Sequence, residues 1–509
     1  MAMKKLFSAV LASMMILSIL SGASACTAFY AGAALTEDGS TIFARSEDYA
    51  NSQNKLFYVS PAGNHAAGEE YSGCYGFTYT FTHDSYGYTA FRDDNGEAVD
   101  YVCPDCGQVH AHTPYEAAGT NDQGLTITAT ETLGCSEAVE AVDPYEELGI
   151  EEAEIVTVIL SEAATAKEAV ALLLNIYDTA GANAGSGILI ADNQETWYIE
   201  NVTGHAYIAV KLTDTMLMVQ PNMSIIGLID LDDTENVIAS ANLIAVAQEA
   251  GTYVGSLEDN TINYVASYNG STAPNARMVN ALAFLDTPYN EETGNIDYLI
   301  SNVDENGAIV PLYTNIKAAG PIAIETVQAF YKIGNIGYQR NLETHIFQIY
   351  PQGGAAGTVE WVAMNDAAIN VFVPYYPMLT TDVDASYKLS TATAGFGAEK
   401  TGGVCYPTTV NQWVDGERVA VEGYRSLPEN WADSMYWSFD ALSNLILFAD
   451  VSEEAADAAI AALAEKQAEI NAAFAALQGD MTAQEATAFS MNTAQQVHAL
   501  AVELVKNIQ

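Results

Sequence analysis

Short apolar stretches separated by turn residues dominate the first half of the chain and predict β-strands. The first two strands, residues 26–32 and 41–45, are joined by a turn that contains Asp38-Gly39-Ser40. Similar segments recur further along. They predict a strand at 125–130 and two strand pairs, 187–191 with 196–200 and 206–212 with 216–219.

Two predicted helices divide these strands into an earlier and a later group. The helices cover residues 151–160 and 166–177, and Thr165 with Glu168 forms a capping box before the second one. Residues 50–115 are less regular and rich in Tyr, Gly and His, which favours loops, with an insertion at 65–112. Strands, then two helices, then more strands indicate a layered α+β domain and not a parallel doubly wound sheet.

Helical spacing returns at the end of the chain, over residues 451–509. Ser452 can cap a helix whose first turn holds Glu453 and Glu454, the favourable charge for that end. Thr482 and Glu485 form a second capping box before a last helix. We interpret the pair as a hairpin that packs on the main domain, residues 26–450, in preference to a partner-binding module.

The first 25 residues have the pattern of a secretory signal peptide. Lys4 and Lys5 precede an apolar run from Leu6 to Leu20, and small residues lead to Cys26. The run is too short for a membrane span, and no second run is long enough. Cleavage before Cys26 would give a secreted protein with an N-terminal cysteine. The alternative is a membrane-anchored lipoprotein acylated at Cys26, although Ala23 suits ordinary signal peptidase better.

The amino-acid composition excludes some classes of function. The 509 residues include 65 acidic and 17 basic side chains, a formal net charge of −48. Such a surface repels phosphate backbones, so nucleic-acid binding is set aside. Half of the residues are hydrophobic, which indicates a folded globular chain and not a disordered one.

A cluster of cysteines and histidines is a candidate metal site. Cys103, Cys106, His110 and His112 resemble half of a zinc knuckle, and two thiolates with two imidazoles suffice for tetrahedral zinc. The usual second half is absent and an exported protein meets oxidising conditions, so a Cys103–Cys106 disulfide or unpaired thiols are the alternatives. A zinc ion here would be structural. Catalysis would require no cofactor.

Cys26 is the candidate nucleophile. The sequence contains no GxSxG elbow, HExxH motif or P-loop. An N-terminal cysteine carries its thiol and its own α-amine on one residue, and that amine can exchange a proton with the thiol near neutral pH. Thiolate formation needs a nearby positive charge, for which Arg45 is a candidate. A carboxylate must orient the amine, for which Asp48 is a candidate, although the two could instead form a structural ion pair.

The ordered blocks of this sequence resemble the bacterial PepD-like cysteine dipeptidases, which are N-terminal nucleophile hydrolases. The resemblance starts at Cys26-Thr27 and continues through Arg45-Ser46-Glu47-Asp48 and the block that runs from Gly119 to Thr132. It extends over nearly the whole mature chain. Later blocks include Ala191-Asp192, Pro221-Asn222, Trp361, Pro374-Tyr375-Tyr376 and Tyr436-Trp437.

The resemblance implies a four-layer αββα sandwich and hydrolysis of dipeptides or short peptides through a thioester on Cys26. By this resemblance, Arg45 and Asp48 adjust the reactivity of the nucleophile and orient it. Asn121 and Asn222 contact the oxyanion or the amine, and Arg277 is a further site residue. Asn121 and Asn222 could alternatively be turn residues, and Trp361 and Trp437 core residues.

Two other functions remain open from the sequence. One is a related amidase that acts on bile salts or penicillin V, since those enzymes share the distant pattern of an initial Cys followed by Arg-x-x-Asp. The other is a membrane-tethered binding lipoprotein. Acylation of Cys26 would block the proposed chemistry, so the lipoprotein and the peptidase exclude each other. The sequence leaves open whether the protein forms a homo-oligomer.

Overall fold

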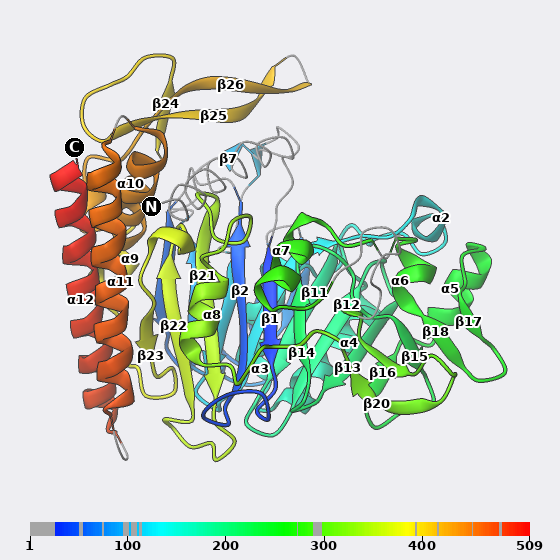
Figure 1. Ribbon diagram of the computed structural model, residues 1–509. Helices are drawn as coiled ribbons and strands as arrows, with labels where there is room; N and C mark the ends of the chain where they lie inside the picture. Colours follow the sequence, from blue (N-terminus) through cyan, green and yellow to red (C-terminus); the bar gives the residue numbers. More distant parts are fainter. Residues whose placement is uncertain are drawn as a thin grey trace.

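Two large antiparallel sheets form the centre of the molecule (Figure 1). The computed structural model describes residues 26–509 apart from 50–53, 74–75, 95–100, 103–108, 111–114, 272, 289–297, 392–393, 415–416, 450, 478–480 and 509. The first sheet has six strands in the order β14 (Leu217–Gln220), β1 (Thr27–Ala31), β2 (Thr41–Asp48), β21 (Asn341–Ile349), β22 (Thr358–Met364) and β23 (Val373–Tyr375).

The second sheet is larger and includes four strands that the sequence pattern did not predict. Its eight strands follow the order β16 (Val237–Ala239), β13 (Tyr207–Leu212), β12 (Thr196–Asn201), β11 (Gly185–Ala191), β10 (Thr126–Leu133), β9 (Glu116–Asn121), β6 (Tyr88–Asp93) and β3 (Lys55–Ser60). The prediction of loops over 50–115 is therefore wrong for β3 and β6. Both strands are rich in aromatic and β-branched residues, but their pairing joins residues about thirty positions apart.

The predicted pairing of 206–212 with 216–219 is also wrong, although both segments are strands. β13 pairs with β12 in the eight-stranded sheet, whereas β14 pairs with β1 in the six-stranded one. The short connection between them crosses from one sheet to the other instead of forming a hairpin. Strand identity follows from local pattern, but the partner is chosen by tertiary packing.

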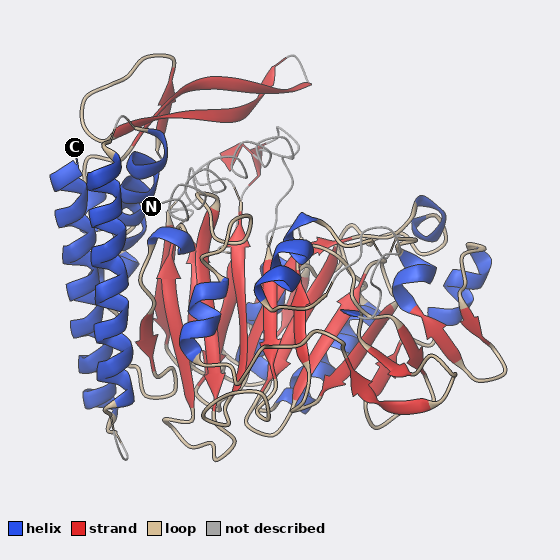
Figure 2. Cartoon of the chain, in the orientation of Figure 1, coloured by secondary structure: helices blue, strands red, loops and turns tan. Residues whose placement is uncertain are grey.

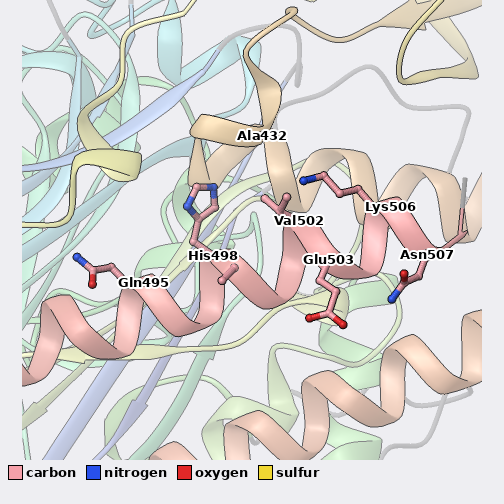
Figure 3. A pocket seen from close by; sticks show the side chains of 8 residues that line it. Ala432, Gln495, His498, Val502, Glu503, Lys506 and Asn507 are labelled. Atoms are coloured by element: carbon pink, nitrogen blue, oxygen red, sulfur yellow. The ribbon is translucent and has the colours of Figure 1, made fainter.

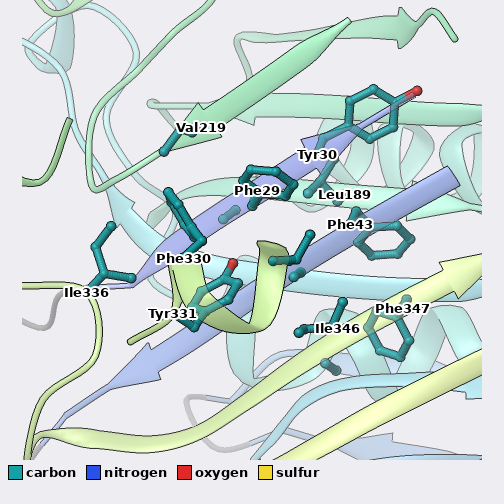
Figure 4. Packing of buried hydrophobic residues seen from close by; sticks show 14 of the residues in the cluster. Phe29, Tyr30, Phe43, Leu189, Val219, Phe330, Tyr331, Ile336, Ile346 and Phe347 are labelled. Carbon is teal, nitrogen blue, oxygen red and sulfur yellow. The ribbon is translucent and has the colours of Figure 1, made fainter. Parts of the chain in front are cut away.

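Alternation along β1 and β2 sends side chains to two different layers (Figure 4). Phe29 faces outward and packs on Phe330, with ring centroids 5.0 Å apart. Phe43 faces the other sheet and packs on Phe347 at 5.1 Å. Arg45 has the same parity as Phe43 and therefore also points between the sheets, where its guanidinium reaches a carbonyl of β9.

Helices cover the outer faces of both sheets (Figure 2). Contacts on the eight-stranded sheet come from α3 (Glu152–Glu162) and α4 (Ala166–Thr179), where Thr165 caps α4 as predicted. The helices that contact the six-stranded sheet are α7 (Ala276–Phe284), α8 (Ile324–Phe330) and α10 (Met435–Phe448). The order of layers is helix, sheet, sheet, helix. The predicted α+β fold, a four-layer αββα sandwich, is confirmed.

The chain ends in two long helices that stand side by side along the β23 edge (Figure 1). They are α11 (Glu453–Ala475) and α12 (Ala483–Ile508). Ser452 accepts a hydrogen bond from the backbone N–H of Ala455, which confirms the predicted cap. Gln467 of α11 accepts from the backbone N–H of Phe372 and donates to its carbonyl, so the helices are attached to the sandwich by main-chain contacts.

Smaller elements decorate the sandwich. In the region predicted to be an insertion, β4 (Glu70–Ser72) pairs with β5 (Thr78–Thr80), and β7 (Tyr101–Val102) with β8 (Val109–His110). None of the described helices is both long and apolar enough to cross a membrane. The remaining strands are β15 (Leu228–Asp230), β17 (Gly255–Ser256), β18 (Thr261–Asn263), β19 (Ser301–Val303), β20 (Ile309–Tyr313), β24 (Gly395–Gly397), β25 (Cys405–Val414) and β26 (Glu417–Ser426), and the remaining α-helices are α2 (Glu137–Glu140), α5 (Leu243–Glu249), α6 (Tyr264–Tyr268) and α9 (Ala385–Lys388).

Candidate active site

Cys26 lies immediately before β1 and is buried, with 1% of its surface exposed. The antiparallel register of β1 and β2 sets Ala28 opposite Arg45. Because Cys26 and Ala28 share the parity that points between the sheets, the thiol meets the arginine side chain. Nη2 of Arg45 donates to Sγ of Cys26 at 3.3 Å.

Arg45 is fully buried and is held by neighbours from β9, from the residue just before β9 and from α3. Its Nη1 donates to the carbonyl of Ala117 in β9 at 3.1 Å, and its Nη2 lies 3.5 Å from the hydroxyl of Tyr115. Its ion-pair partner is Glu152, in the first turn of α3, at 2.5 Å. The sequence did not single out Glu152, because nothing local in an acidic chain distinguishes it from the other 64 carboxylates (65 − 1).

Opposing effects act on the Cys26 thiol. Burial raises the pKa of the thiol to about 11, and the carboxylates of Glu152 and Asp48 add to that rise, whereas the Arg45 guanidinium lowers it. For Arg45, burial disfavours the charge, but its anionic surroundings still hold the pKa well above the usual value. A thiol in this setting is protonated near neutral pH unless a base removes its proton.

Asp48 lies on the opposite, outer face of β2 and forms an ion pair with Arg277 at 2.6 Å. Burial raises the pKa of Asp48, while Arg277 and a hydrogen bond from Asn341 lower it. Arg277 also donates to Oγ1 of Thr27 at 2.9 Å. The sequence therefore placed Asp48 and Arg277 correctly near the start of β1, but Asn341 went unnoticed because no motif surrounds it.

Arg45 and Asp48 each have a different charged partner. Arg45 pairs with Glu152 between the sheets, whereas Asp48 pairs with Arg277 under α7. The three-residue spacing in an extended strand is responsible, since positions of opposite parity face opposite sides. The alternative interpretation, an ion pair between Arg45 and Asp48, therefore does not describe the structure, in which each of the two residues has its own partner.

Asn222 reaches the neighbourhood of Cys26 through the β1–β14 pairing. Ala28, two residues after Cys26, lies opposite Gln220, the last residue of β14, and Asn222 follows two residues beyond that strand end. Its φ of 56° is in the left-handed region, where Asn is tolerated better than most residues. The carbonyl of Pro221 accepts a hydrogen bond from Asn275, the N-cap residue of α7, at 2.5 Å. This contact ties the Asn222 turn to the helix that carries Arg277.

Asn121 is not brought to the site, contrary to the expected role in oxyanion or amine binding. Its side-chain Nδ2 donates to the carbonyls of Leu160 and Ala163, at 3.0 and 2.8 Å. Its Oδ1 accepts from the backbone N–H groups of Gln123 and Leu125. The residue ends β9 at the far end from Ala117 and stabilises the turn, so the alternative interpretation as a turn residue fits the structure.

The candidate zinc ligands Cys103, Cys106 and His112 lie outside the described residues. Only the backbone of His110 is placed, in β8. Within the described part of the chain, no group of three or more His, Cys, Asp or Glu side chains could hold a metal ion. Structural zinc therefore stays a prediction.

Both tryptophans that the sequence assigned to the core are there. Trp361 and Trp437 are each fully buried. Trp361 packs on Phe474 of α11, with ring centroids 4.8 Å apart, and Trp437 donates to Thr391.

A separate surface hollow lies on α12 (Figure 3). It has a volume of about 490 Å³ and is open to solvent. Its lining residues come from η4 (Trp431–Asp433) and α12, and include Gln495, His498 and Lys506. The hollow shares no lining residue with the surroundings of Cys26.

The chain belongs to peptidase family C69. A family profile described as "Peptidase family C69" matches residues 25–284 and 313–398, more than half of the sequence. The match begins one residue before Cys26 and includes β1, β2 and α7, the elements that carry the site. The predicted membership in a family of bacterial dipeptidases is confirmed at the level of the family, and the protein is a peptidase.

Individual relatives carry dipeptidase names. The chain is 30% identical over 413 residues to "Probable dipeptidase B" of Streptococcus pyogenes serotype M18 (strain MGAS8232), which covers 76% of this chain and 79% of the relative. It is 28% identical over 373 residues to "Probable dipeptidase" of Salmonella dublin, covering 69% and 81%. Among solved structures it is similar to penicillin V acylase from Agrobacterium tumefaciens, at 14% identity and a TM-score of 0.32, covering 69% and 86%.

Proposed function

We propose that this peptidase is a secreted cysteine dipeptidase in which Cys26, exposed as the N-terminal residue by removal of residues 1–25, is the nucleophile. The observation that carries the proposal is the hydrogen bond from Arg45 Nη2 to Cys26 Sγ at 3.3 Å, at the first residue before β1. A buried cation beside a thiol favours the thiolate. The dipeptidase names of the relatives support a short peptide as substrate.

The reaction proceeds in two halves. The free α-amine of Cys26 takes the thiol proton, and the sulfur attacks the peptide carbonyl. The amine then returns the proton to the leaving amino group as the C–N bond breaks, which leaves a thioester on Cys26. Water, deprotonated by the same amine, attacks the thioester and releases the acid, and the thiol is restored.

The remaining site residues receive distinct roles. Asp48, held by Arg277, orients the α-amine, and Arg45 stabilises negative charge on sulfur. Asn222, in the turn that follows β14, supplies a hydrogen bond to the oxyanion. Since an uncut chain has a peptide nitrogen at residue 26 in place of an amine, it lacks the base, and the thiol with its pKa near 11 stays protonated.

The test compares Cys26→Ala and Cys26→Ser with a matched control, Cys135→Ser, which removes a free thiol in the loop between β10 and α2. Protein exported from a bacterial host is assayed on a panel of dipeptides, longer peptides, a conjugated bile salt and penicillin V. We expect dipeptide hydrolysis in the wild type and in Cys135→Ser, and a loss of about 10³-fold or more in Cys26→Ala.

Intact mass and N-terminal sequencing accompany the assay. A terminus at Cys26 with an unmodified mass supports the mechanism. A lipid on Cys26, or full activity in Cys26→Ala, would contradict it. Turnover of the bile salt or penicillin V alone would keep the nucleophile but replace the substrate.

A further inference from the structure

Glu152 joins two parts of the site through its two carboxylate oxygens. Its Oε1 accepts from Arg45 Nη2 at 2.5 Å, and its Oε2 accepts from the backbone N–H of Glu131 in β10 at 2.8 Å. Only 9% of the side-chain surface is exposed. Both oxygens therefore act as acceptors, one from a guanidinium nitrogen and the other from a backbone N–H.

The nitrogen that contacts Glu152 is the same one that contacts the nucleophile. Arg45 Nη2 donates to Cys26 Sγ at 3.3 Å as well as to Glu152. Arg45 Nε is buried and has no hydrogen-bond partner among the described residues. The orientation of the guanidinium therefore depends on Nη1, which binds the Ala117 carbonyl, and on the Glu152 contact at Nη2.

From this geometry we infer that Glu152 is a positioning residue of the peptidase site: it aims Arg45 at the Cys26 sulfur and offsets part of the guanidinium charge. Glu152 acts through Arg45 and need not touch the substrate. Its effect on turnover rests on the proposed function, whereas its effect on the Cys26 thiol does not. Both effects can be measured separately.

The expected direction of the change in the pKa of the Cys26 thiol follows from the groups around it. Removing the charge of Glu152 leaves Arg45 uncompensated next to the sulfur, which favours the thiolate. The opposite arrangement on the outer face, Asp48 with Arg277, is unchanged by this substitution. The charged and titratable groups that face Cys26 are Arg45 and Asp48 of β2, Glu152 of α3, Arg277 of α7, and Tyr115, Tyr331 and Tyr338.

The experiment measures alkylation of Cys26 by iodoacetamide as a function of pH, in the exported wild type and in Glu152→Gln. Mass spectrometry of the Cys26 peptide separates this thiol from the other five cysteines. We expect the midpoint of the pH profile to fall by about one unit in Glu152→Gln, because one nearby negative charge is lost. We also expect kcat/KM for a dipeptide to fall about tenfold or more, because a glutamine has one acceptor oxygen in place of the two that separately bind Arg45 and the Glu131 N–H.

Glu162→Gln is the matched control. It removes the same charge from the other end of α3, about 15 Å away by helical rise, where the carboxylate binds Thr82. An equal midpoint in Glu152→Gln and Glu162→Gln would overturn the inference, whether or not the protein hydrolyses dipeptides. A shifted midpoint without any wild-type turnover would instead uphold the coupling and refute the proposed function.

A second variant, Glu152→Asp, separates charge from position and guards against misfolding of Glu152→Gln. It keeps the negative charge on a side chain one methylene shorter. We expect a midpoint like that of the wild type together with a reduced kcat/KM. Wild-type kcat/KM in Glu152→Asp would show that the reach of the side chain does not matter and would overturn the positioning role.

Discussion

At the scale of single residues, the site depends on which side of β2 a side chain faces. Arg45 points between the sheets to Cys26 and Glu152, whereas Asp48 points outward to Arg277. Both Arg45 and Asp48 are buried, and each forms an ion pair with an oppositely charged side chain. A buried ion pair contributes little net stability, but removing one member leaves an uncompensated charge. Substitutions that remove one member of either ion pair should therefore lower the stability of the protein measurably.

Asp48→Asn should destabilise the protein by about 3 kcal/mol, because it leaves Arg277 buried without its anion. Asparagine has nearly the same shape, so the effect isolates the charge. Urea denaturation of the wild type and variant at pH 7 measures it. Glu465→Gln, an exposed charge on α11, is the control and should change stability by less than about 0.5 kcal/mol. A similar, small change in Asp48→Asn would contradict the prediction.

Asn121→Ala should lower stability without removing the chemistry. The substitution leaves two backbone N–H groups and two carbonyls without the partner that now binds them, at a cost of about 2–3 kcal/mol. We expect kcat/KM for a dipeptide to stay within about twofold of the wild type, because Asn121 acts on a turn away from Cys26. Denaturation and a dipeptide assay on the same samples test both halves. A hundredfold loss of activity in folded protein would restore the catalytic role that the resemblance implied.

At the scale of elements, the C-terminal helices are attached by specific polar contacts as well as by apolar packing. Gln467 of α11 bonds both main-chain groups of Phe372 and also donates to Asn471, at 2.9 Å. On α12, Ser490 donates to the carbonyl of Pro374 at 2.8 Å. These contacts close the β22–β23 edge of the six-stranded sheet, which would otherwise expose unpaired backbone groups.

Gln467→Ala should loosen this attachment. We expect a loss of about 2 kcal/mol, because the Phe372 N–H and carbonyl lose their partners in a buried setting. Hydrogen exchange should rise in α11 and around Phe372 while the central strands stay protected. The control, Gln496→Ala, removes the same amide from an exposed position of α12. Equal exchange in the two variants would show that apolar packing alone holds the helices.

At the scale of the whole molecule, the layer between the two sheets holds several carboxyl groups. Burial raises the pKa of Glu360 to about 8 and that of Glu200 to about 7. Glu360 keeps a hydrogen bond from Thr89 of the facing sheet at 2.7 Å, and its Oε1 has no hydrogen-bond partner within the described part of the chain. These groups couple the stability of the sandwich to pH.

Glu360→Gln should make the free energy of unfolding depend less on pH. Between an unfolded pKa of about 4.5 and a folded pKa of about 8, the folded state binds a proton that the unfolded state has released, so the free energy of unfolding falls as pH rises. One such group contributes a slope of about 1.4 kcal/mol per pH unit, which the variant lacks. Urea denaturation at pH 5, 6, 7 and 8 measures the slopes, with Glu465→Gln as control. Parallel curves for wild type and Glu360→Gln would contradict the assignment.

Much of the architecture was determined by the sequence alone. Period-two alternation, turn residues and capping boxes are local signals, and they located β1, β2, α3, α4, α11 and α12. The resemblance to a known family selected Cys26, Arg45, Asp48 and Arg277 as site residues, and the structure sets them near the start of β1. These residues can be found without a structure because the family pattern keeps them in recognisable blocks and because Cys26 follows a leader-like segment.

Only the tertiary structure decided which strands pair and which charges meet. β13 and β14 look like a hairpin in sequence but belong to different sheets, and β3 and β6 enter the large sheet through long-range pairing. Glu152 is one acidic residue among many until α3 sets it against Arg45, 107 positions away in sequence. Asn121 has the residue type expected of an oxyanion contact, but its side-chain amide forms hydrogen bonds within and around a turn instead. Such contacts depend on chain crossings between layers, and no local pattern encodes them.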